Sequence, residues 1–429
     1  MRLRPRTLAC FFLAASVALT APAFAESGAS FVISGQHRWL YRYSSPVGLG
    51  IPSADGLERA RNAESLQLLR NTIQIEARWQ AAWRAVLQVG GWYALGDLER
   101  ARPPDADLGD VSLAFVEWSD PHTRLRVGRQ ELPLGSTRWF STRDGANVRQ
   151  TLDLLRATAT FSQATLDVFA GAVPRLRRGW FDDLPNRHEP LLGIYTTVEL
   201  VPAGVLALDL YALYRQHAEQ PLEAHLSGDR RMTFGMSTGG ATQAGAEYIQ
   251  HALFQVGERH GAHSLAWGLS AAFWQRLPGL LRVVRLGLRL DALSGDKHAE
   301  GKRTGTFDPL FPNQTFFSPH PAIYPSNLYS IHPLFTVMQG KLKLEAGCIL
   351  LWRQSVSDGI YESNAEITRA PSSPKSAHTG EQMSIQLGYE IDEHFDTELV
   401  FSRLFAGRGI EDAGGTDVSF FGSSLSLRY

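Results

Sequence analysis

The stretch FGSSLSLRY, residues 421–429, ends this chain and carries the first indication of its fold. Leu425, Leu427 and Tyr429 alternate with polar residues, so their side chains share one face of an extended strand. An amphipathic final strand with an aromatic terminal residue is typical of bacterial outer-membrane barrels, in which the last strand pairs with the first. Soluble sheets also end on strands, so the rest of the chain has to decide between the two.

The first 25 residues are predicted to be a secretory signal peptide. Arg2, Arg4 and Arg6 supply the positive segment, residues 8–20 are apolar, and residues 23–25 (Ala-Phe-Ala) form a small-x-small cleavage site. No later apolar run reaches the roughly 20 residues that a membrane helix needs. We therefore expect residues 26–429 to form a single exported barrel domain without an inner-membrane anchor.

Cysteine content and net charge exclude further classes of protein. Cys348 is the only cysteine after residue 25, which excludes an intramolecular disulfide. Without residues 1–25 the chain carries 39 basic and 43 acidic residues, so no basic excess is present to bind nucleic acid. Arg outnumbers Lys by 37 to five. This bias reflects either bidentate recognition of carboxylates by arginine or only the codon usage of a GC-rich genome.

Period-two alternation of apolar and polar residues recurs along the whole chain, and helical periodicity is scarce. Most segments have the roughly 9–11 residues, or slightly more, that a tilted transmembrane strand requires. The sequence predicts 18 strands, near residues 31–43, 66–79, 83–95, 111–118, 123–132, 152–161, 164–173, 191–200, 204–215, 231–238, 243–255, 262–275, 282–293, 327–338, 341–353, 379–391, 394–405 and 417–429.

The connections between these segments alternate in length. Those after even-numbered strands are tight, whereas most of those after odd-numbered strands are long. The long connections are residues 44–65, 96–110, 133–151, 174–190, 294–326 and 354–378. Short periplasmic turns combined with long extracellular loops are typical of an outer-membrane barrel. The sequence therefore predicts an all-β, antiparallel, transmembrane barrel in the bacterial outer membrane.

The alternation also assigns the two faces of each strand. In residues 283–291 the even-numbered leucines point one way, whereas Arg285, Arg289 and Asp291 point the other. Such charged side chains cannot form a dry core, because burying unpaired charge is too costly. The apolar face is therefore expected to contact lipid and the charged face a water-filled lumen. The basic residues placed in the lumen by this argument are Arg38, Arg42, Arg285, Arg289 and Arg353.

The densest group of charged residues lies between residues 128 and 156. It contains Gly128-Arg129-Gln130, Arg143-Asp144, Asn147, Arg149, Asp153 and Arg156. Together with Ser294-Gly295-Asp296 and the segment TFDPLFP at 306–312, this block resembles the alginate export porin family of 18-stranded outer-membrane barrels. The resemblance covers most of residues 30–429 and implies a channel with an arginine-rich pathway for an anionic polysaccharide.

The resemblance also implies roles for individual residues. Those that would line the constriction or hold its arginines in place are Arg129, Arg143, Arg149 and Arg156, with Asn147 and Asp153. Alternation alone turns Arg129 toward lipid, unless Gly128 introduces a bulge that shifts the strand. A ring of guanidinium groups replaces part of the hydration of a carboxylate and rejects cations. Alternatively, these arginines only pair with acids and stiffen a wide wall.

The sequence thus predicts a channel for anionic saccharides, with a general, weakly selective porin as the alternative. Gated members of the family close the pore with an extended periplasmic turn, which this sequence lacks. The loop 133–151 is the segment that can instead fold inward as a constriction. The expected partners are outer-membrane lipid, lipopolysaccharide, the barrel assembly machinery and an anionic oligo- or polysaccharide. The expected oligomeric state is a monomer.

No enzymatic activity, cofactor or metal site is expected. The segment GMSTG at 235–239 fits the pattern of a nucleophile elbow, but an elbow needs a strand-to-helix turn and the sequence indicates two strands here. Asp105, Asp107 and Asp110 are close enough in sequence to bind a divalent cation. A solvated acidic loop is the preferred interpretation of these three residues.

Overall fold

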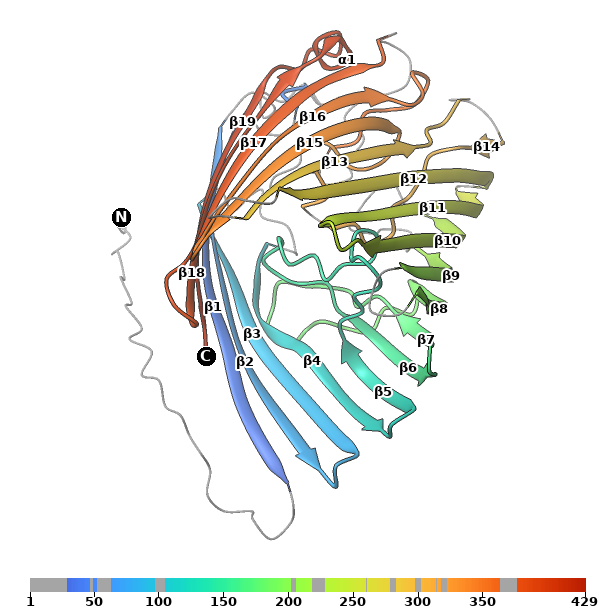
Figure 1. Cartoon of the computed structure of the whole chain (residues 1–429), viewed down its shortest axis with the longest axis vertical. Coiled ribbons are helices and arrows are strands. Elements are labelled where there is room, and N and C mark those ends of the chain that lie inside the picture. The colour runs from blue at the N-terminus through green and yellow to red at the C-terminus, as the bar shows by residue number, and fades with distance from the viewer. Residues whose placement is uncertain are drawn as a thin grey trace, which may run out of the picture.

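The computed structural model describes residues 29–46, 49–51, 63–96, 105–201, 206–217, 228–259, 261–277, 283–297, 302–313, 315–317, 322–362 and 376–429. The predicted signal peptide, residues 1–25, lies outside the described residues. Eighteen long antiparallel strands form one closed barrel (Figure 1), which confirms the predicted fold class. No helix in the described part is long and apolar enough to cross a membrane.

The strands agree with the predicted segments to within a few residues. Their bounds are β1 Ser30–Ser45, β2 Glu64–Trp79, β3 Trp83–Gly96, β4 Asp107–Ser119, β5 Thr123–Gln130, β6 Leu152–Thr160, β7 Ala164–Ala172, β8 Pro190–Val201, β9 Leu206–Gln216, β10 Asp229–Ala241, β11 Ala246–Arg259, β12 Ala262–Leu277, β13 Val283–Leu293, β15 Leu328–Gln339, β16 Leu342–Arg353, β17 His378–Glu390, β18 Phe395–Ala406 and β19 Val418–Arg428. The short elements β14 (Arg303–Thr304) and α1 (Arg408–Glu411) belong to connections between wall strands.

The last strand closes the barrel against the first. β19 pairs antiparallel with β1, and the pairing extends from Gln36 opposite Arg428 to Ser45 opposite Ser419. In Figure 1 the blue β1 meets the red strands of the chain end at the left of the barrel. The structure therefore confirms the pairing that the alternation in residues 421–429 predicts.

Short turns occupy one end of the barrel. Asp120 caps the β4–β5 turn, because its carboxylate accepts hydrogen bonds of 2.7 Å from the backbone N–H groups of His122 and Thr123. Asp392 caps the β17–β18 turn in the same way, with two hydrogen bonds of 2.8 Å. These carboxylates satisfy donors that the strand ladder does not reach. The short turns identify this end as periplasmic.

Long connections occupy the opposite, extracellular end. They are residues 46–63, 97–106, 131–151, 173–189, 217–228, 294–327, 354–377 and 407–417. The connection between β11 and β12 is the exception at this end, because only residues 260–261 separate the two strands. The difference in length between the two ends agrees with the pattern expected from the sequence.

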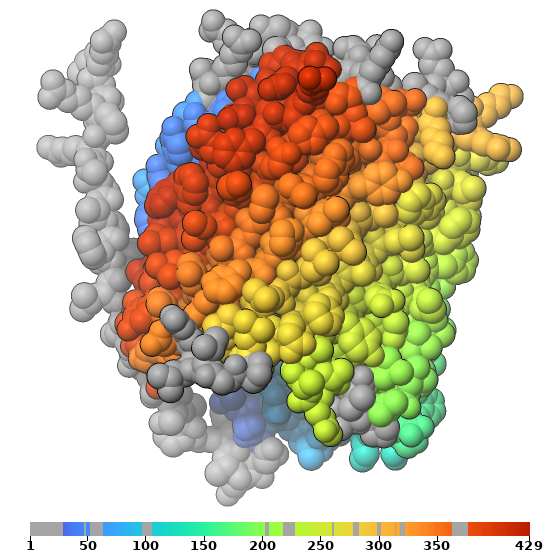
Figure 2. Space-filling model, turned by 45° about the horizontal axis from the view of Figure 1, so that its top comes forward, coloured from blue at the N-terminus to red at the C-terminus, as the bar shows by residue number. Residues whose placement is uncertain are grey.

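The exposure of the side chains confirms the predicted faces. On β17, Met383 and Ile385 are each 52% exposed, whereas Ser384 between them is 8% exposed and Gln382 before them is 2% exposed. On β13, Leu286 and Leu288 are likewise exposed and face outward. The outward side chains form the surface that contacts lipid. Figure 2 shows consecutive strands crossing this surface obliquely, as tilted transmembrane strands do.

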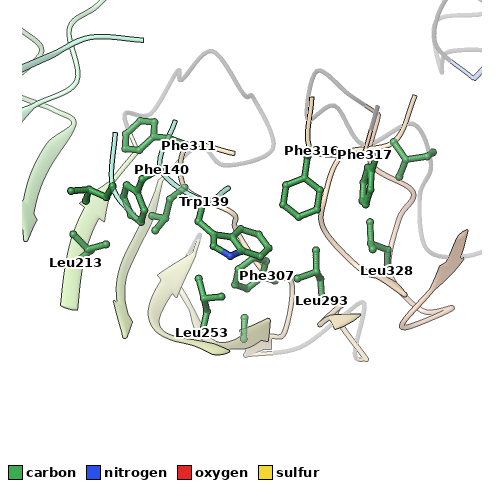
Figure 3. Close-up of a cluster of buried hydrophobic side chains, with 14 of the residues drawn as sticks. Trp139, Phe140, Leu213, Leu253, Leu293, Phe307, Phe311, Phe316, Phe317 and Leu328 are labelled. Atoms are coloured by element: carbon green, nitrogen blue, oxygen red, sulfur yellow. The ribbon is translucent and has the colours of Figure 1, made fainter. Parts of the chain in front are cut away.

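Two of the extracellular loops fold into the barrel and pack against its wall (Figure 3). Their buried aromatic side chains are Trp139, Phe140, Phe307, Phe311, Phe316 and Phe317. Leucines from the wall strands, including Leu213, Leu253 and Leu293, complete this cluster. The interior of the barrel therefore combines an apolar cluster, made largely by loops, with the charged wall that the alternation predicts.

Candidate functional site

The segment 131–151, called the inner loop below, crosses the inside of the barrel. At one end, Arg70 of β2 donates a hydrogen bond of 2.8 Å to the main-chain oxygen of Asn147. Toward the other end, a hydrogen bond of 3.2 Å joins Ser136 Oγ and His251 Nε2 of β11. β2 and β11 lie on nearly opposite sides of the closed ring of strands. The inner loop thus folds inward as the sequence allows, and it narrows the lumen.

A second loop holds the inner loop in place. The backbone N–H of Ser141 donates to the main-chain oxygen of Phe311 at 3.0 Å, and the backbone N–H of Phe311 donates to the main-chain oxygen of Trp139 at 3.2 Å. The ring of Trp139 also lies 5.5 Å from that of Phe307 and 5.0 Å from that of Phe316, measured between centroids. Packed side chains therefore fill this side of the lumen, and a hydrated solute has to pass elsewhere.

A cavity of about 430 Å³ remains between the inner loop and the wall formed by β1 to β3. Most of its lining residues are polar or charged. The lining residues include Gln36, Arg70, Thr72, Gln74, Gln88, Ser112, Glu131, Asp144, Arg149 and Thr151. We call this cavity the passage. Another depression, of about 330 Å³ over β10–β13, involves outward-facing residues such as Met236 and Leu269 and belongs to the lipid-facing surface.

Arg70 anchors the inner loop beside the passage. Its side chain is only 1% exposed, and its Nη1 donates to Asp144 Oδ1 at 2.7 Å. Arg38 of β1 adds hydrogen bonds of 2.8 Å to the main-chain oxygens of Asp144 and Ala146. The donors of both arginines are directed at the loop. These arginines therefore position the constriction rather than offer their charge to a solute.

Arg149, Asp144 and Glu131 form the accessible charged surface of the passage. Arg149 Nε lies 3.1 Å from a carboxylate oxygen of Glu131 and 3.2 Å from one of Asp144. The side chains of Arg149 and Asp144 are 36% and 61% exposed, although both lie inside the barrel. Arg149 is thus far more accessible from the passage than Arg70, whose side chain is 1% exposed.

The two carboxylates of the passage differ in their protonation. Burial within the barrel raises the pKa of Asp144, but the guanidinium groups of Arg70 and Arg149 outweigh this effect and hold it below its usual value. Burial raises the pKa of Glu131, and Asp144 adds to the increase against the opposing effect of Arg149. As the pH falls, Glu131 therefore loses its charge before Asp144 does.

Asn147 and Arg143, two of the predicted site residues, lie on the inner loop itself. Asn147 is fully buried, and its Nδ2 donates to the main-chain oxygens of Leu69 and Asp105 at 3.1 and 3.0 Å. Arg143 is partly buried and adopts a positive φ of 50°. The structure thus brings Asn147, Arg143 and Arg149 together on one loop, and Asn147 ties that loop to the wall.

Arg129 and Asp153 lie outside this cluster. They are opposite one another on β5 and β6, with 2.8 Å between Arg129 Nε and Asp153 Oδ1. The pairing register continues through Gly128 with both neighbouring strands, although Gly128 itself has a positive φ of 123°. The Arg129 side chain is only 10% exposed and also lies 3.9 Å from Asp110 and 3.8 Å from Asp183. Arg129 and Asp153 therefore lie among acids near the start of β4, away from the cluster around Asp144.

Two further predicted arginines pair with buried acids, one in the loop before β4 and one on a wall strand. Arg42 of β1 lies 2.8 Å from Asp105, and Arg156 of β6 lies 2.8 Å from Asp167 of β7. Asp105 and Asp167 are both buried. These contacts agree with the alternative interpretation of the arginines, in which they stiffen the wall.

The other three predicted arginines are spread over β13 and β16. Arg285 pairs with Glu247 of β11, and the Arg289 guanidinium lies 5.5 Å from the ring centroid of Trp274. Arg353 is 3% exposed and donates to the main-chain oxygen of Asp358 at 3.2 Å, which holds the loop after β16. None of these three contributes to the cluster around Asp144.

Sequence reasoning missed Arg70 and Arg138 as structural residues of the site. A signal for Arg70 exists, because the outward positions of Ile73 and Ile75 place the even-numbered residues of β2 in the lumen. Arg138 anchors the inner loop through an ion pair of 2.8 Å with Asp291, which lies 153 positions away. No local pattern in the sequence indicates that contact.

The segment 235–239 does not form a nucleophile elbow. All five residues lie within β10 and pair regularly with both neighbouring strands. An elbow requires a sharp turn from a strand into a helix, which lifts the serine out of the sheet. The structure therefore removes the sequence feature that could have suggested an acyl-transfer activity.

Solved structures of other outer-membrane channels share this barrel. Pseudomonas aeruginosa OccK2 (OpdF), in a crystal structure with glucuronate, matches with a TM-score of 0.62 and 12% identity, over 93% of this chain and 97% of that one. OccK5 (OpdH) of the same species matches with a TM-score of 0.59 and 9% identity, over 93% of this chain and 98% of that one. Acinetobacter baumannii OccAB4 matches with a TM-score of 0.58 and 9% identity, over 92% of this chain and 98% of that one. At such low identities these matches show the fold alone.

A family model provides the more direct assignment. No significant match is found among curated proteins. The model described as alginate export matches residues 35–423, which is nearly all of the chain outside the predicted signal peptide. The match spans the strands, the inner loop and the passage described above. The chain therefore belongs to the alginate export family and is an integral outer-membrane β-barrel that forms a channel for solutes.

Proposed function

We propose that this channel conducts anionic saccharides, with uronates as the solute class, through the passage beside β1 to β3. The observation that carries the proposal is the accessible guanidinium group of Arg149 in the narrowed part of the lumen. Three guanidinium groups, of Arg38, Arg70 and Arg149, surround the two carboxylates of Glu131 and Asp144. The cluster therefore carries an excess of positive charge.

A guanidinium group at this position suits a uronate in two ways. It remains charged at every physiological pH, and its donors match the two oxygens of a carboxylate. Its effect on a passing ion is also stronger in a confined lumen than in bulk water, because the protein wall lowers the effective dielectric constant. The polar lining, including Gln74 and Gln88, adds groups that can hydrogen-bond sugar hydroxyls.

The structural neighbours guide the choice of probe. OccK2 was crystallised with glucuronate, which is a sugar with a carboxylate. At 12% identity this neighbour shows the fold alone, so it supplies a test compound rather than evidence about the substrate of this chain.

A general, weakly selective porin is the second candidate function. The observation in its favour is Asp144, whose side chain is the more exposed member of the Arg149–Asp144 pair, at 61%. A carboxylate of this exposure beside the arginine offsets part of the attraction that an anion would feel. The two functions differ in ion selectivity and in block by uronates.

Planar-bilayer recordings of the refolded protein distinguish them. We expect a reversal potential that shows anion preference in a KCl gradient, together with block of the current by glucuronate or uronate oligomers. Arg149→Gln should reduce the anion preference and weaken the block. Arg230→Gln is the matched control, because Arg230 lies on β10 and pairs with Glu258 outside the passage. A large, weakly selective and unblocked current in the unmodified protein would favour the general porin.

A further inference from the structure

Three buried carboxylates meet at the extracellular rim. Asp107 and Asp110 come from the start of β4, and Asp183 comes from the loop 173–189. One carboxylate oxygen of each lies within 4.8 Å of the other two. Asp107 is 2% exposed and Asp110 is 5% exposed. These acids do not form the solvated loop expected from the sequence, because loop 173–189 covers them. Asp105 instead pairs with Arg42.

Asp107 lacks the partners that a buried carboxylate needs. Its Oδ1 accepts a hydrogen bond of 3.1 Å from the backbone N–H of Gly109. Its Oδ2 is buried and has no hydrogen-bond partner in the described part of the protein. Buried polar atoms are almost always satisfied by protein, water or an ion, since leaving a carboxylate oxygen unpaired costs free energy. The Asp107 carboxylate that carries this oxygen belongs to the same group as the Asp110 and Asp183 carboxylates.

The nearest arginine does not satisfy the three acids. Arg129 Nη1 lies 3.9 Å from Asp110 and 3.8 Å from Asp183, which are longer than hydrogen bonds. The hydrogen bonds of Arg129 go instead to Asp153 and to the main-chain oxygen of Val111. Three carboxylates thus face a single guanidinium group, whose hydrogen bonds go elsewhere, so the group has an excess of acidic side chains.

We propose that Asp107, Asp110 and Asp183 bind a calcium ion that fastens loop 173–189 to the end of β4. Ca²⁺ prefers several oxygen ligands and tolerates irregular geometry. The metal-binding group found among the described residues contains carboxylates only, which disfavours transition metals that prefer histidine or cysteine. Main-chain oxygens and water would complete the coordination.

The ion would join two segments that are otherwise linked mainly through their backbones. The N–H of Phe181 donates to the main-chain oxygen of Gly109 at 2.8 Å, and the N–H of Leu108 donates to the main-chain oxygen of Arg178 at 3.3 Å. The N–H of Asp183 also donates to Asp110 Oδ2 at 2.9 Å. Because Asp183 lies more than 70 positions after Asp107, a shared cation at this point would order the loop at the rim.

Binding is measured on the full mature chain, refolded in detergent and freed of metal with a chelator. Calorimetric titration with CaCl₂ should show one site per chain, with a dissociation constant on the order of 10⁻⁴–10⁻³ M, as for extracellular calcium sites. Loop order is followed by trypsin cleavage at Arg177 and Arg178, which are exposed in the loop. At about 10 mM Ca²⁺ and a dissociation constant of about 1 mM, cleavage should slow about tenfold.

Two variants test the ligands. Asp107→Asn and Asp183→Asn should each abolish the calcium-dependent protection and the calorimetric signal. Glu393→Gln is the matched control, because Glu393 is an acid on a periplasmic turn and its side chain is 87% exposed. It should behave like the unmodified protein.

Several results would overturn the proposal. The unmodified protein decides first, since the absence of saturable Ca²⁺ binding up to about 10 mM contradicts the site even if a variant does not fold. Binding that persists in both variants rejects these ligands. Tighter binding of Mg²⁺ than of Ca²⁺ rejects the choice of ion. Identical trypsin cleavage of Asp107→Asn and the unmodified protein, with and without Ca²⁺, would instead indicate a neutral, protonated Asp107.

Discussion

Replacing Arg70 by methionine should weaken the attachment of one end of the inner loop while leaving the barrel intact. Arg70 donates to Asn147 at 2.8 Å, to Asp144 Oδ1 at 2.7 Å and to the main-chain oxygen of Asp144 at 2.9 Å. Methionine retains much of the apolar stem of the side chain and removes all of these donors. The opposite end of the loop keeps its anchors, namely the ion pair of Arg138 and the aromatic cluster.

The size of the effect follows from what Arg70 leaves behind. Hydrogen bonds to a charged group contribute about 1.5–3 kcal/mol. The upper end applies to Arg70, because its side chain is 1% exposed and makes several such bonds to the loop, whereas Asp144 is 61% exposed and regains water when Arg70 is lost. A loss of about 3 kcal/mol lowers the ratio of docked to undocked loop by roughly 100-fold, since 1.4 kcal/mol corresponds to a factor of ten.

Two assays report the undocking of the loop. Single-channel recordings should show a higher open conductance and more current noise than the unmodified channel. Trypsin should cleave the loop at Arg143 or Arg149 up to about 100-fold faster, if docking and undocking are fast relative to cleavage. The barrel itself should still resist unfolding in SDS at room temperature, because the contacts of Arg70 that are lost are mainly with the loop.

Arg156→Met is the matched control for this experiment. Arg156 is an arginine of the wall, its side chain is 18% exposed, and it pairs with Asp167 of the neighbouring strand. It should change neither the conductance noise nor the cleavage of the loop. If Arg70→Met matches the unmodified protein and this control in both assays, then Arg70 does not hold the constriction and the reasoning is refuted.

Two further predictions concern pH and lipid. Anion preference should increase as the pH falls from about 7 toward about 4.3, the ordinary glutamate pKa. The reason is that the pKa of Glu131 is raised and that of Asp144 is lowered, so Glu131 becomes neutral while Asp144 keeps its charge. Ion selectivity measured across this range should lose its pH dependence in Glu131→Gln, and a pH dependence that persists in this variant would contradict the assignment. Leu288→Arg should destabilise the folded barrel by about 2–4 kcal/mol if residue 288 lies near the bilayer midplane, because Leu288 is exposed on the outward face of β13. Urea titration in lipid vesicles measures this effect, with Leu288→Met as the control. Equal stability of the two variants would mean that the face is wrongly assigned.

The architecture could be predicted from the sequence because its signals are local. A residue such as Ile385 is assigned to lipid, and Ser384 to the lumen, from their immediate neighbours alone. Asp120 and Asp392 indicate tight turns for the same reason, since each carboxylate bonds backbone groups two and three residues ahead.

The candidate site was predicted only in part. Asn147, Arg143 and Arg149 could be selected because they cluster within one loop of the sequence. Their partners could not, because Arg70 lies 77 positions from Asn147 and Asp291 lies 153 positions from Arg138. Such contacts depend on how the inner loop crosses the lumen, and no periodicity of the sequence encodes that path.

The sequence by itself determined the strand order, the lipid and lumen faces and the end that carries the long loops, because alternation and turn chemistry act over a few residues. Only the tertiary structure decided which arginines remain accessible. Both Arg149 and Arg70 line the passage, but the side chain of Arg149 is 36% exposed, whereas that of Arg70 is 1% exposed and binds the inner loop. It also decided that Asp183 joins Asp107 and Asp110. The physical reason is that burial and charge pairing depend on segments brought together by closure of the barrel.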